Sequence, residues 1–154
     1  MARESRDENP DVREALSQSP GYLLSQASRL LRERTAAALE PFLLSLNDYV
    51  VLRLVGLNAR LSQGALGDTY GIDPATMVSV IDKLEAQKLL SRERNAADRR
   101  RYLLRLTPKG AKLLTRVRTK VTKAQKKFLS AVSDEEWDTV RSILWKLIEK
   151  AETD

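Results

Sequence analysis

The Lys and Arg side chains between residues 83 and 127 are the residues in this chain that most clearly point to a chemistry. This stretch holds 16 of the 27 Lys and Arg residues and only 3 of the 21 Asp and Glu residues, so it carries +13 while the rest carries −7. Such a stretch attracts a polyanion, because each neutralised phosphate releases condensed counterions, and nucleic acid is the first candidate. A solvated helix face explains the charge about as well. An anionic lipid surface is a weaker alternative, because only Tyr102 and Phe128 could anchor the stretch in a bilayer.

The chain lacks the side chains that most catalytic and metal sites require. It contains no Cys and no His, which excludes disulfides, thiolate metal cages, imidazole catalysis and most zinc and haem ligand sets. Nucleophile-elbow, P-loop and dinucleotide-binding motifs are also missing from the sequence. The acidic residues Asp134, Glu135 and Glu136 are explained by the dipole of the helix that they begin. We therefore predict that the protein is not an enzyme and uses no cofactor and no metal.

Two short helices joined by a glycine turn are predicted in the middle of the chain. Ser62 can cap a helix over 63–70, and Gly71 can adopt the left-handed conformation of a tight turn. Asp73 then caps a second helix that has Pro74 in its first turn. The inward residues of this helix are Met77, Val80, Ile81 and Leu84, and the outward ones are Ala75, Thr76, Ser79, Asp82 and Lys83. This is the pattern of a helix-turn-helix, although many all-helical domains contain similar pairs.

A hairpin with a basic tip is predicted directly after this pair of helices. Residues 89–94 and 102–106 are of extended type, and the polar loop NAADRRR at 95–101 connects them. A basic hairpin after a helix-turn-helix is the winged-helix arrangement. In that arrangement the second helix enters the major groove of DNA while the wing reaches toward the adjacent minor groove.

Longer amphipathic helices are predicted on both sides of this unit. Apolar residues recur at three- and four-residue steps over 21–39, which ends before Pro41, and Asn47 is predicted to cap a short helix running toward Gly56. The chain is helical again from Pro108, with an apolar stripe of Leu113, Val117, Val121, Ala124 and Phe128. These helices exceed what a small helix-turn-helix core needs. Packing within one chain is one use for the surplus, but a helical dimer interface is the better one, and we expect the helices to form it.

A capping box predicts the start of the last helix. Ser133 and Glu136 form the box, and Val132 and Trp137 stand where a hydrophobic staple would pack. The apolar stripe of this helix consists of Trp137, Val140, Ile143, Leu144, Leu147 and Ile148.

The chain is predicted to form one domain after a flexible polar leader at residues 1–19. Residues 20–154 form this domain, with a DNA-binding lobe at about 47–107 and dimerisation helices at about 20–40 and 108–152. The leader lacks the apolar run of a signal peptide, and no apolar stretch reaches the length of about 18 residues needed to cross a bilayer. We therefore expect a cytoplasmic protein without a membrane partner.

The predicted wing carries a motif that resembles the signature of the MarR family, the multiple-antibiotic-resistance type of transcription regulators. Asp98-Arg99-Arg100 is followed after five residues by Leu106-Thr107 and after two more by Gly110. The order of helices is also similar, and the resemblance covers about residues 20–150. It implies a mainly α (α+β) fold, a winged helix-turn-helix with N- and C-terminal dimerisation helices. It also implies a homodimer on a pseudo-palindromic operator in double-stranded DNA, with half-site centres about 10 base pairs apart.

The resemblance assigns roles to individual residues of the wing and of the second helix. Asp98 corresponds to an acid that orients Arg100 toward the minor groove, where an Arg suits the negative potential; alternatively, the pair merely stabilises a surface turn. Loss of Arg99 or Arg101 is expected to lower affinity for DNA in general. The expected contacts of the second helix come from Pro74, Ala75, Thr76, Val78, Ser79 and Lys83. Of these, Ala75, Thr76 and Ser79 are expected to reach base edges, while Ser62, Gln63 and Lys83 are expected to hold phosphate.

Two residues depart from the family pattern. Family members often carry Arg at the position of Ser79, so the operator of this protein cannot be taken from relatives. They often carry Gly at the position of Lys88. Lys88 must therefore adopt an unfavourable backbone conformation, or the helix must end differently here.

Many relatives respond to small aromatic anions, and Tyr49 and Arg53 could bind such an effector through an aromatic body and a cation. A core Tyr and a surface Arg is the simpler interpretation of the same two residues. Sensing through cysteine or histidine is excluded by the composition. The predicted function is a homodimeric, sequence-specific transcription regulator, a repressor released by a small molecule. A sequence-indifferent architectural DNA binder and a protein-interaction module are the alternatives.

Overall fold

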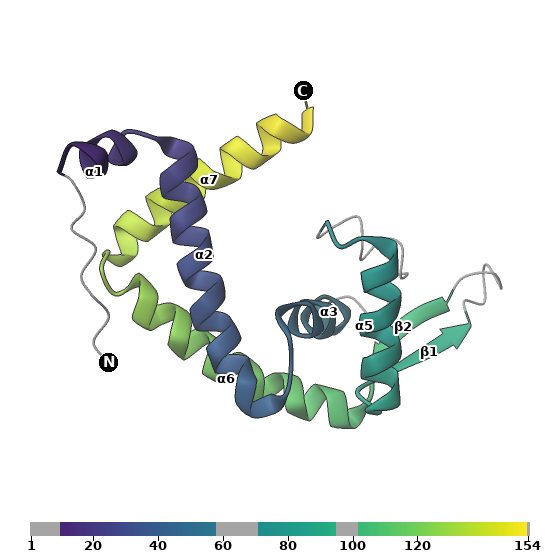
Figure 1. The fold of residues 1–154 in the computed structure, drawn as a ribbon. Coiled ribbons are helices and arrows are strands. Elements are labelled where there is room, and N and C mark those ends of the chain that lie inside the picture. The colour runs from purple at the N-terminus through teal and green to yellow at the C-terminus, as the bar shows by residue number, and fades with distance from the viewer. Residues whose placement is uncertain (1–9, 58–70, 95–101, 154) are drawn as a thin grey trace.

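The described residues, 10–57, 71–94 and 102–153 of a computed structural model, form two lobes connected by one long helix (Figure 1). The elements in chain order are α1 (Pro10–Ser17), α2 (Pro20–Leu39), a 3₁₀ turn η1 (Glu40–Phe42), α3 (Leu46–Leu57), α5 (Pro74–Ala86), β1 (Leu90–Arg94), β2 (Tyr102–Leu106), α6 (Pro108–Leu129) and α7 (Asp134–Thr153). One lobe contains α3, α5 and the hairpin, and the other contains α1, α2 and α7. Helix α6 begins in the first lobe and runs alongside α2 into the second. None of the helices in these ranges is long and apolar enough to span a membrane.

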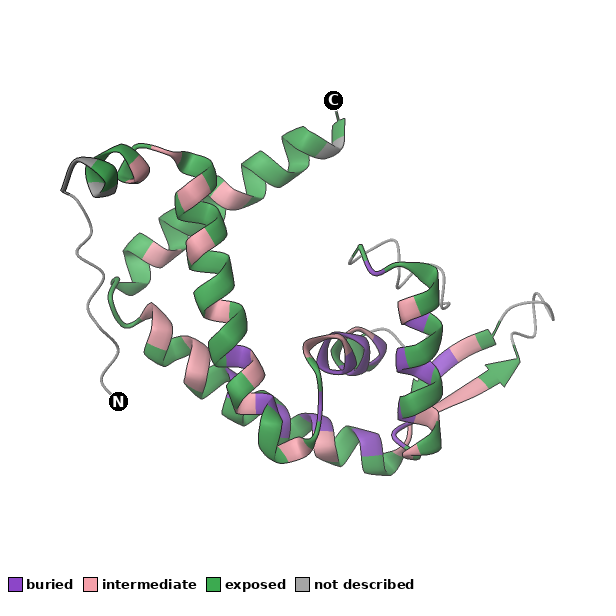
Figure 2. Ribbon diagram, viewed as in Figure 1, coloured by how far each residue is buried: buried purple, intermediate pink, exposed green. Residues whose placement is uncertain are grey.

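The hydrophobic core fills the lobe of α3, α5 and the hairpin and ends where α2 meets α6 (Figure 2). Its fully buried side chains come from every element of that lobe and from the adjoining parts of α2 and α6: Leu39, Val51, Leu52, Val55, Met77, Ile81, Leu84, Leu90, Leu104, Val117 and Val121. The four residues predicted to face inward on α5 are all buried, because the three- and four-residue spacing places them on one side of the helix. The predicted hairpin is confirmed, with β1 and β2 antiparallel and Leu90 opposite Leu106.

Three predicted details of the helices are corrected by the structure. Helix α3 begins at Leu46 instead of after Asn47. Its cap is Ser45, whose Oγ accepts from the Asp48 N–H at 3.1 Å while the Asp48 carboxylate accepts from the Ser45 N–H at 2.7 Å. The leader expected to be flexible contains helix α1, which contacts α2. On α6, Leu114 is buried whereas Leu113 is only half-buried.

The backbone at Lys88 answers the question left open by the sequence. Lys88 adopts the left-handed conformation, with φ 59°. Its N–H donates to the Glu85 carbonyl at 2.8 Å, and the Leu89 N–H donates to the Leu84 carbonyl at 2.9 Å. These two bonds form a Schellman motif, which ordinarily ends in Gly. The helix therefore ends in the turn that Gly ordinarily closes, and Lys88 adopts the strained conformation that Gly would adopt freely.

The start of α6 is clamped to this same turn. The Thr107 hydroxyl donates to the Lys88 carbonyl at 2.7 Å and accepts from the Gly110 N–H at 3.0 Å. A Cβ on Gly110 would lie 2.0 Å from the Leu89 carbonyl oxygen, so only glycine fits there. The Leu-Thr-x-x-Gly half of the wing motif is thus a structural joint between α5 and α6.

Helix α7 begins as predicted and then packs against very little. The Ser133 N–H donates to Glu136 at 2.7 Å, and the Glu136 N–H donates to the Ser133 hydroxyl at 3.2 Å, which confirms the capping box. Beyond this start the helix is exposed along almost its whole length (Figure 2). Its exposed apolar side chains are 41% to 61% accessible: Val140, Ile143, Trp145, Leu147 and Ile148.

Candidate nucleic-acid interface and ligand pocket

The first turn of α5 is held by two features that the sequence predicted. Gly71 has φ 63°, as the tight turn before the helix requires. The Asp73 carboxylate accepts a hydrogen bond from the Thr76 N–H at 2.9 Å, and Pro74 follows it in the first turn. Hydrogen bonds from the Thr76 side chain and backbone lower the pKa of Asp73, so the cap is ionised at neutral pH. The helix therefore begins at a defined place and presents its first turn to solvent.

The outer face of α5 presents small side chains. Pro74, Ala75, Val78 and Ser79 are exposed, and Thr76 is half-buried. Val78, an apolar residue, is 41% accessible on this face. A face of this kind lets a helix approach another surface closely, with hydroxyls to donate and methyl groups to pack, as major-groove contacts require.

The opposite end of the outer face is occupied by ion pairs within the chain. The Lys83 Nζ lies 2.5 Å from the Asp48 carboxylate of α3, which is 1% accessible. Its ammonium therefore holds α3 against α5, a role that the sequence did not predict. The other Asp48 oxygen is buried and has no hydrogen-bond partner in the described ranges.

Arg92 of β1 joins the hairpin to α5. Its guanidinium lies 2.5 Å from Asp82 and also contacts Glu85. Burial opposes the charge of this group, but hydrogen bonds to the two carboxylates outweigh burial and hold the pKa of Arg92 above its ordinary value. The hairpin is thus fixed against the α5 residues Asp82 and Glu85.

Most of the predicted wing and phosphate contacts lie outside the described residues. These are Ser62 and Gln63 before α5, and Asp98, Arg99, Arg100 and Arg101 in the hairpin loop. The register of the strands, ending with Arg94 opposite Tyr102, fixes where that loop leaves the hairpin. On the strands themselves Arg105 pairs with Glu93.

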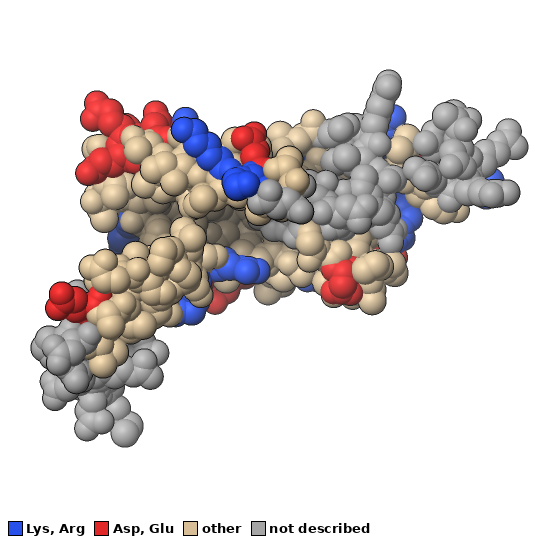
Figure 3. Space-filling model, turned by 90° about the horizontal axis from the view of Figure 1, so that it is seen from above, with Lys and Arg blue, Asp and Glu red and all other residues tan. Residues whose placement is uncertain are grey.

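A hollow of about 800 Å³ lies between α2, α3 and the start of α5. Both residues predicted to bind an effector line it: Tyr49 is 7% accessible, whereas Arg53 is exposed. Asp73 and Thr76 line its other side, so the hollow reaches the first turn of α5. Figure 3 looks down on this face of the molecule and shows Lys and Arg atoms on both sides of a central recess.

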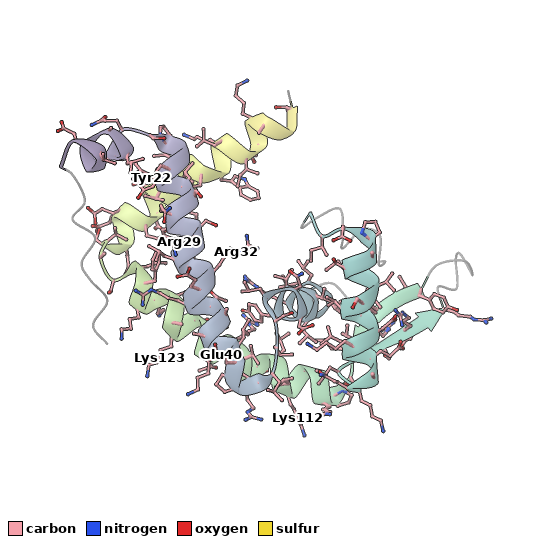
Figure 4. All side chains as sticks on the ribbon, viewed as in Figure 1. Tyr22, Arg29, Arg32, Glu40, Lys112 and Lys123 are labelled. Atoms are coloured by element: carbon pink, nitrogen blue, oxygen red, sulfur yellow. The ribbon has the colours of Figure 1, made fainter. Side chains whose placement is uncertain are left out.

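Arg32 is a pocket residue that the sequence analysis missed. It lines the same hollow from α2 and points toward the lobe of α3 (Figure 4). Ser28, Arg32 and Thr35 follow each other at four- and three-residue steps on α2, a polar stripe that could have indicated this face. Arg32 of α2 and Arg53 of α3 thus line one cavity.

Comparison with known sequences finds that the chain is similar to several transcription regulators. The MarR family profile matches residues 44–101. A putative transcriptional regulatory protein for the hcr operon of Thauera aromatica is 34% identical over 99 residues, which are 64% of this chain and 60% of that protein's length. The HTH-type transcriptional repressor Rv2887 of Mycobacterium tuberculosis is 29% identical over 82% of this chain and 91% of its own.

Solved structures extend the likeness to the fold. CouR, a transcriptional repressor bound to a 23-mer DNA duplex, is 28% identical, with a TM-score of 0.80 over 86% of this chain and 94% of its own. CouR from Rhodococcus jostii RHA1 is also known with p-coumaroyl-CoA. Rv2887 in complex with salicylic acid superimposes with a TM-score of 0.69 and 29% identity over 84% of this chain and 96% of its own. The match of residues 44–101 to the MarR family model and the shared fold of these structures show that the chain is similar, in sequence and in fold, to MarR-family regulators.

Proposed function

We propose that this protein is a homodimeric, sequence-specific DNA-binding transcription regulator, a repressor that a small aromatic anion releases from its operator. The observation that carries the proposal is the outer face of α5, where Ala75, Val78 and Ser79 stand exposed on a helix capped by Asp73. Small side chains let the helix sit deep in a major groove, where Ala75 and Val78 meet thymine methyl groups and Thr76 and Ser79 meet base edges. Asp98 and Arg100 are proposed to act in the minor groove, and Arg99 and Arg101 to bind phosphate.

Dimerisation follows from the exposed apolar stripe of α7. Ile143, Leu147 and Ile148 in this stripe are about half accessible. Their exposure to water is unfavourable in free energy, and a second copy that covers the stripe would remove this apolar surface from water. Two copies related by a two-fold axis present two α5 helices to one side of a duplex, so the operator is pseudo-palindromic. CouR, which is solved with DNA, has the same fold.

The hollow between α2 and α3 is proposed to bind the effector. Tyr49 supplies an aromatic wall, and Arg32 and Arg53 supply cations for a carboxylate. Asp73 and Thr76 line the hollow too, so a ligand there presses on the turn that starts α5. Such a ligand lowers DNA affinity if it binds the DNA-free arrangement more tightly. Rv2887 with salicylic acid and CouR with p-coumaroyl-CoA support an aromatic acid or its thioester.

Selection of bound duplexes from a pool of random sequence tests directly whether the protein binds DNA sequence-specifically. We expect a two-fold symmetric consensus with half-sites about one helical turn apart. Replacing Ser79 with Ala should change the preferred bases, whereas Arg99→Gln should weaken binding on all sequences alike. Enrichment without any consensus would instead establish the architectural DNA binder and overturn the proposal.

Effector binding is tested with salicylate and p-coumaroyl-CoA as probes. We expect one of them to release the selected duplex, and Arg53→Gln and Arg32→Gln to reduce this release at least tenfold without changing DNA affinity. Arg29→Gln is the matched control, because Arg29 lies on α2 but pairs with Glu33 at 2.6 Å and does not line the hollow. An equal effect of all three variants would contradict a ligand held in the hollow.

A further inference from the structure

Helix α6 carries a row of cations that belong neither to the face of α5 proposed to read DNA nor to the hollow. Its 22 residues include eight Lys and Arg residues and no Asp or Glu. Six of the cations follow each other at three- and four-residue steps and are all exposed, and we call them the basic stripe: Lys109, Lys112, Arg116, Lys120, Lys123 and Lys127. With a rise of about 1.5 Å per residue, the stripe is about 27 Å long.

Most of the basic stripe is free to bind a partner. The Lys109 Nζ donates to the Gln87 carbonyl at 2.8 Å, and Arg116 lies over the ring of Phe42. The other four cations have no hydrogen bond or ion pair with any residue that the structure describes. Lys112 and Lys123, both labelled in Figure 4, project from the side of α6 that faces away from α3 and α5.

The basic stripe lies apart from the face of α5 that is proposed to read DNA. It begins at Lys109, beside the C-terminal end of α5, and continues along α6 toward α7 (Figure 1). The exposed residues Ala75 and Ser79 belong to the first half of α5, whose 13 residues span about 20 Å. Only the start of the basic stripe lies near α5, and most of its cations extend away from the face that is proposed to read DNA.

We propose that the basic stripe binds the phosphate backbone of a second stretch of double-stranded DNA. A regular row of cations, four of them without a hydrogen bond or ion pair among the described residues, matches a regular row of phosphates, and each contact releases counterions. An anionic membrane fits less well because Leu114, Val117 and Val121, the apolar residues that such a helix inserts, are buried in the core. A protein partner fits less well because Lys is depleted at protein interfaces. The stripe thus lets one protein bridge two segments of DNA.

The salt dependence of binding to a random-sequence duplex tests this proposal. The variant Lys112→Gln/Lys120→Gln/Lys123→Gln removes three cations, so the slope of log affinity against log salt should fall by about 2.7. Affinity at moderate salt should fall at least tenfold. The matched control, Lys112→Arg/Lys120→Arg/Lys123→Arg, keeps the charges and should keep the wild-type slope. Melting temperatures of both variants show whether the fold is intact.

Capture of a second duplex tests the basic stripe independently of the proposed function. Protein bound to an immobilised duplex should retain a second, labelled duplex, and the Gln variant should lose this retention while its base preference stays unchanged. If the chain read no sequence at all, loss of retention in the Gln variant would still support the stripe. An unchanged salt slope and unchanged retention would overturn it. Binding to phosphatidylserine vesicles that depends on the stripe, with duplex binding unaltered, would also overturn it in favour of a membrane.

Discussion

Helices α5 and α7 have the same kind of apolar periodicity but differ in burial. Helix α5 buries Met77, Val80, Ile81 and Leu84 against the core of its own chain. On α7 no described residue is buried, and Leu147 and Ile148 remain about half accessible. The difference shows that apolar periodicity predicts a face that packs against another surface. It does not show whether that surface belongs to the same chain. The lobe of α3, α5 and the hairpin buries its apolar residues within one copy, whereas α7 leaves its apolar residues exposed.

The largest predicted effect is a difference in unfolding free energy between two Leu→Ala substitutions, one on α5 and one on α7. Leu84→Ala removes a fully buried side chain and should lower the free energy of unfolding by about 2–5 kcal/mol. Leu147→Ala removes a side chain that is 56% accessible, so it should cost the single chain less than about 0.5 kcal/mol. Chemical denaturation measures both values.

Sedimentation equilibrium measures how the same two substitutions affect self-association. Leu147→Ala should weaken self-association by at least tenfold, because each copy loses apolar burial at the interface. Leu84→Ala should leave the association of the folded fraction unchanged. Equal losses of unfolding free energy in the two variants, unchanged when the protein is diluted, would show that α7 is packed within its own chain.

The joint between α5 and α6 provides the next prediction. Gly110→Ala places a Cβ against the backbone carbonyl of Leu89, and we expect a loss of about 1–3 kcal/mol in unfolding free energy. Gly21→Ala on α2 is the control, because no atom lies within 4 Å of its added Cβ, and it should stabilise by about 0.5–1 kcal/mol. Thermal unfolding of both variants measures the difference. Equal behaviour would refute a tight joint.

The strained end of α5 predicts a gain in stability. Lys88→Gly relieves a left-handed lysine and should raise the free energy of unfolding by about 0.5–1 kcal/mol. The same change at Lys112, in the middle of α6, should lower it by about 1 kcal/mol. The gain would vanish if the backbone at Lys88 had negative φ in solution, and denaturant midpoints would then show two losses.

The smallest effect concerns pH and the cap of α5. Hydrogen bonds from Thr76 lower the pKa of Asp73 in the folded chain, so ionised Asp73 favours folding above its unfolded pKa. This contribution is lost as the pH falls through the lowered pKa. Asp73→Ser keeps a cap without a titrating group, so its stability should decline less between pH 5 and pH 2 (about one to two units around the ordinary Asp value). Parallel acid titrations that never diverge would contradict this.

The sequence predicted the parts of the site that depend on near neighbours. Asp73 with Pro74, Ser133 with Glu136, and the inward face of α5 all follow from residues within one or two turns. Asn47 was the wrong cap because Ser45 and Asp48 offered a second local pattern with the same chemistry, and the helix began there. The exposure of α7 in a single copy could not be predicted in this way, because its apolar stripe is equally compatible with packing inside one chain and with a dimer interface.

What the sequence by itself determined is the order and type of the elements, since caps, turns and periodicity act over a few residues. Only the tertiary structure decided that Lys83 pairs with Asp48, 35 residues away in the chain, and that Arg32 of α2 joins Tyr49 and Arg53 around one hollow. It also decided that Lys88 takes the left-handed conformation. These outcomes depend on how whole helices pack, because the burial of the surrounding side chains offsets the local cost of a strained residue or a desolvated carboxylate.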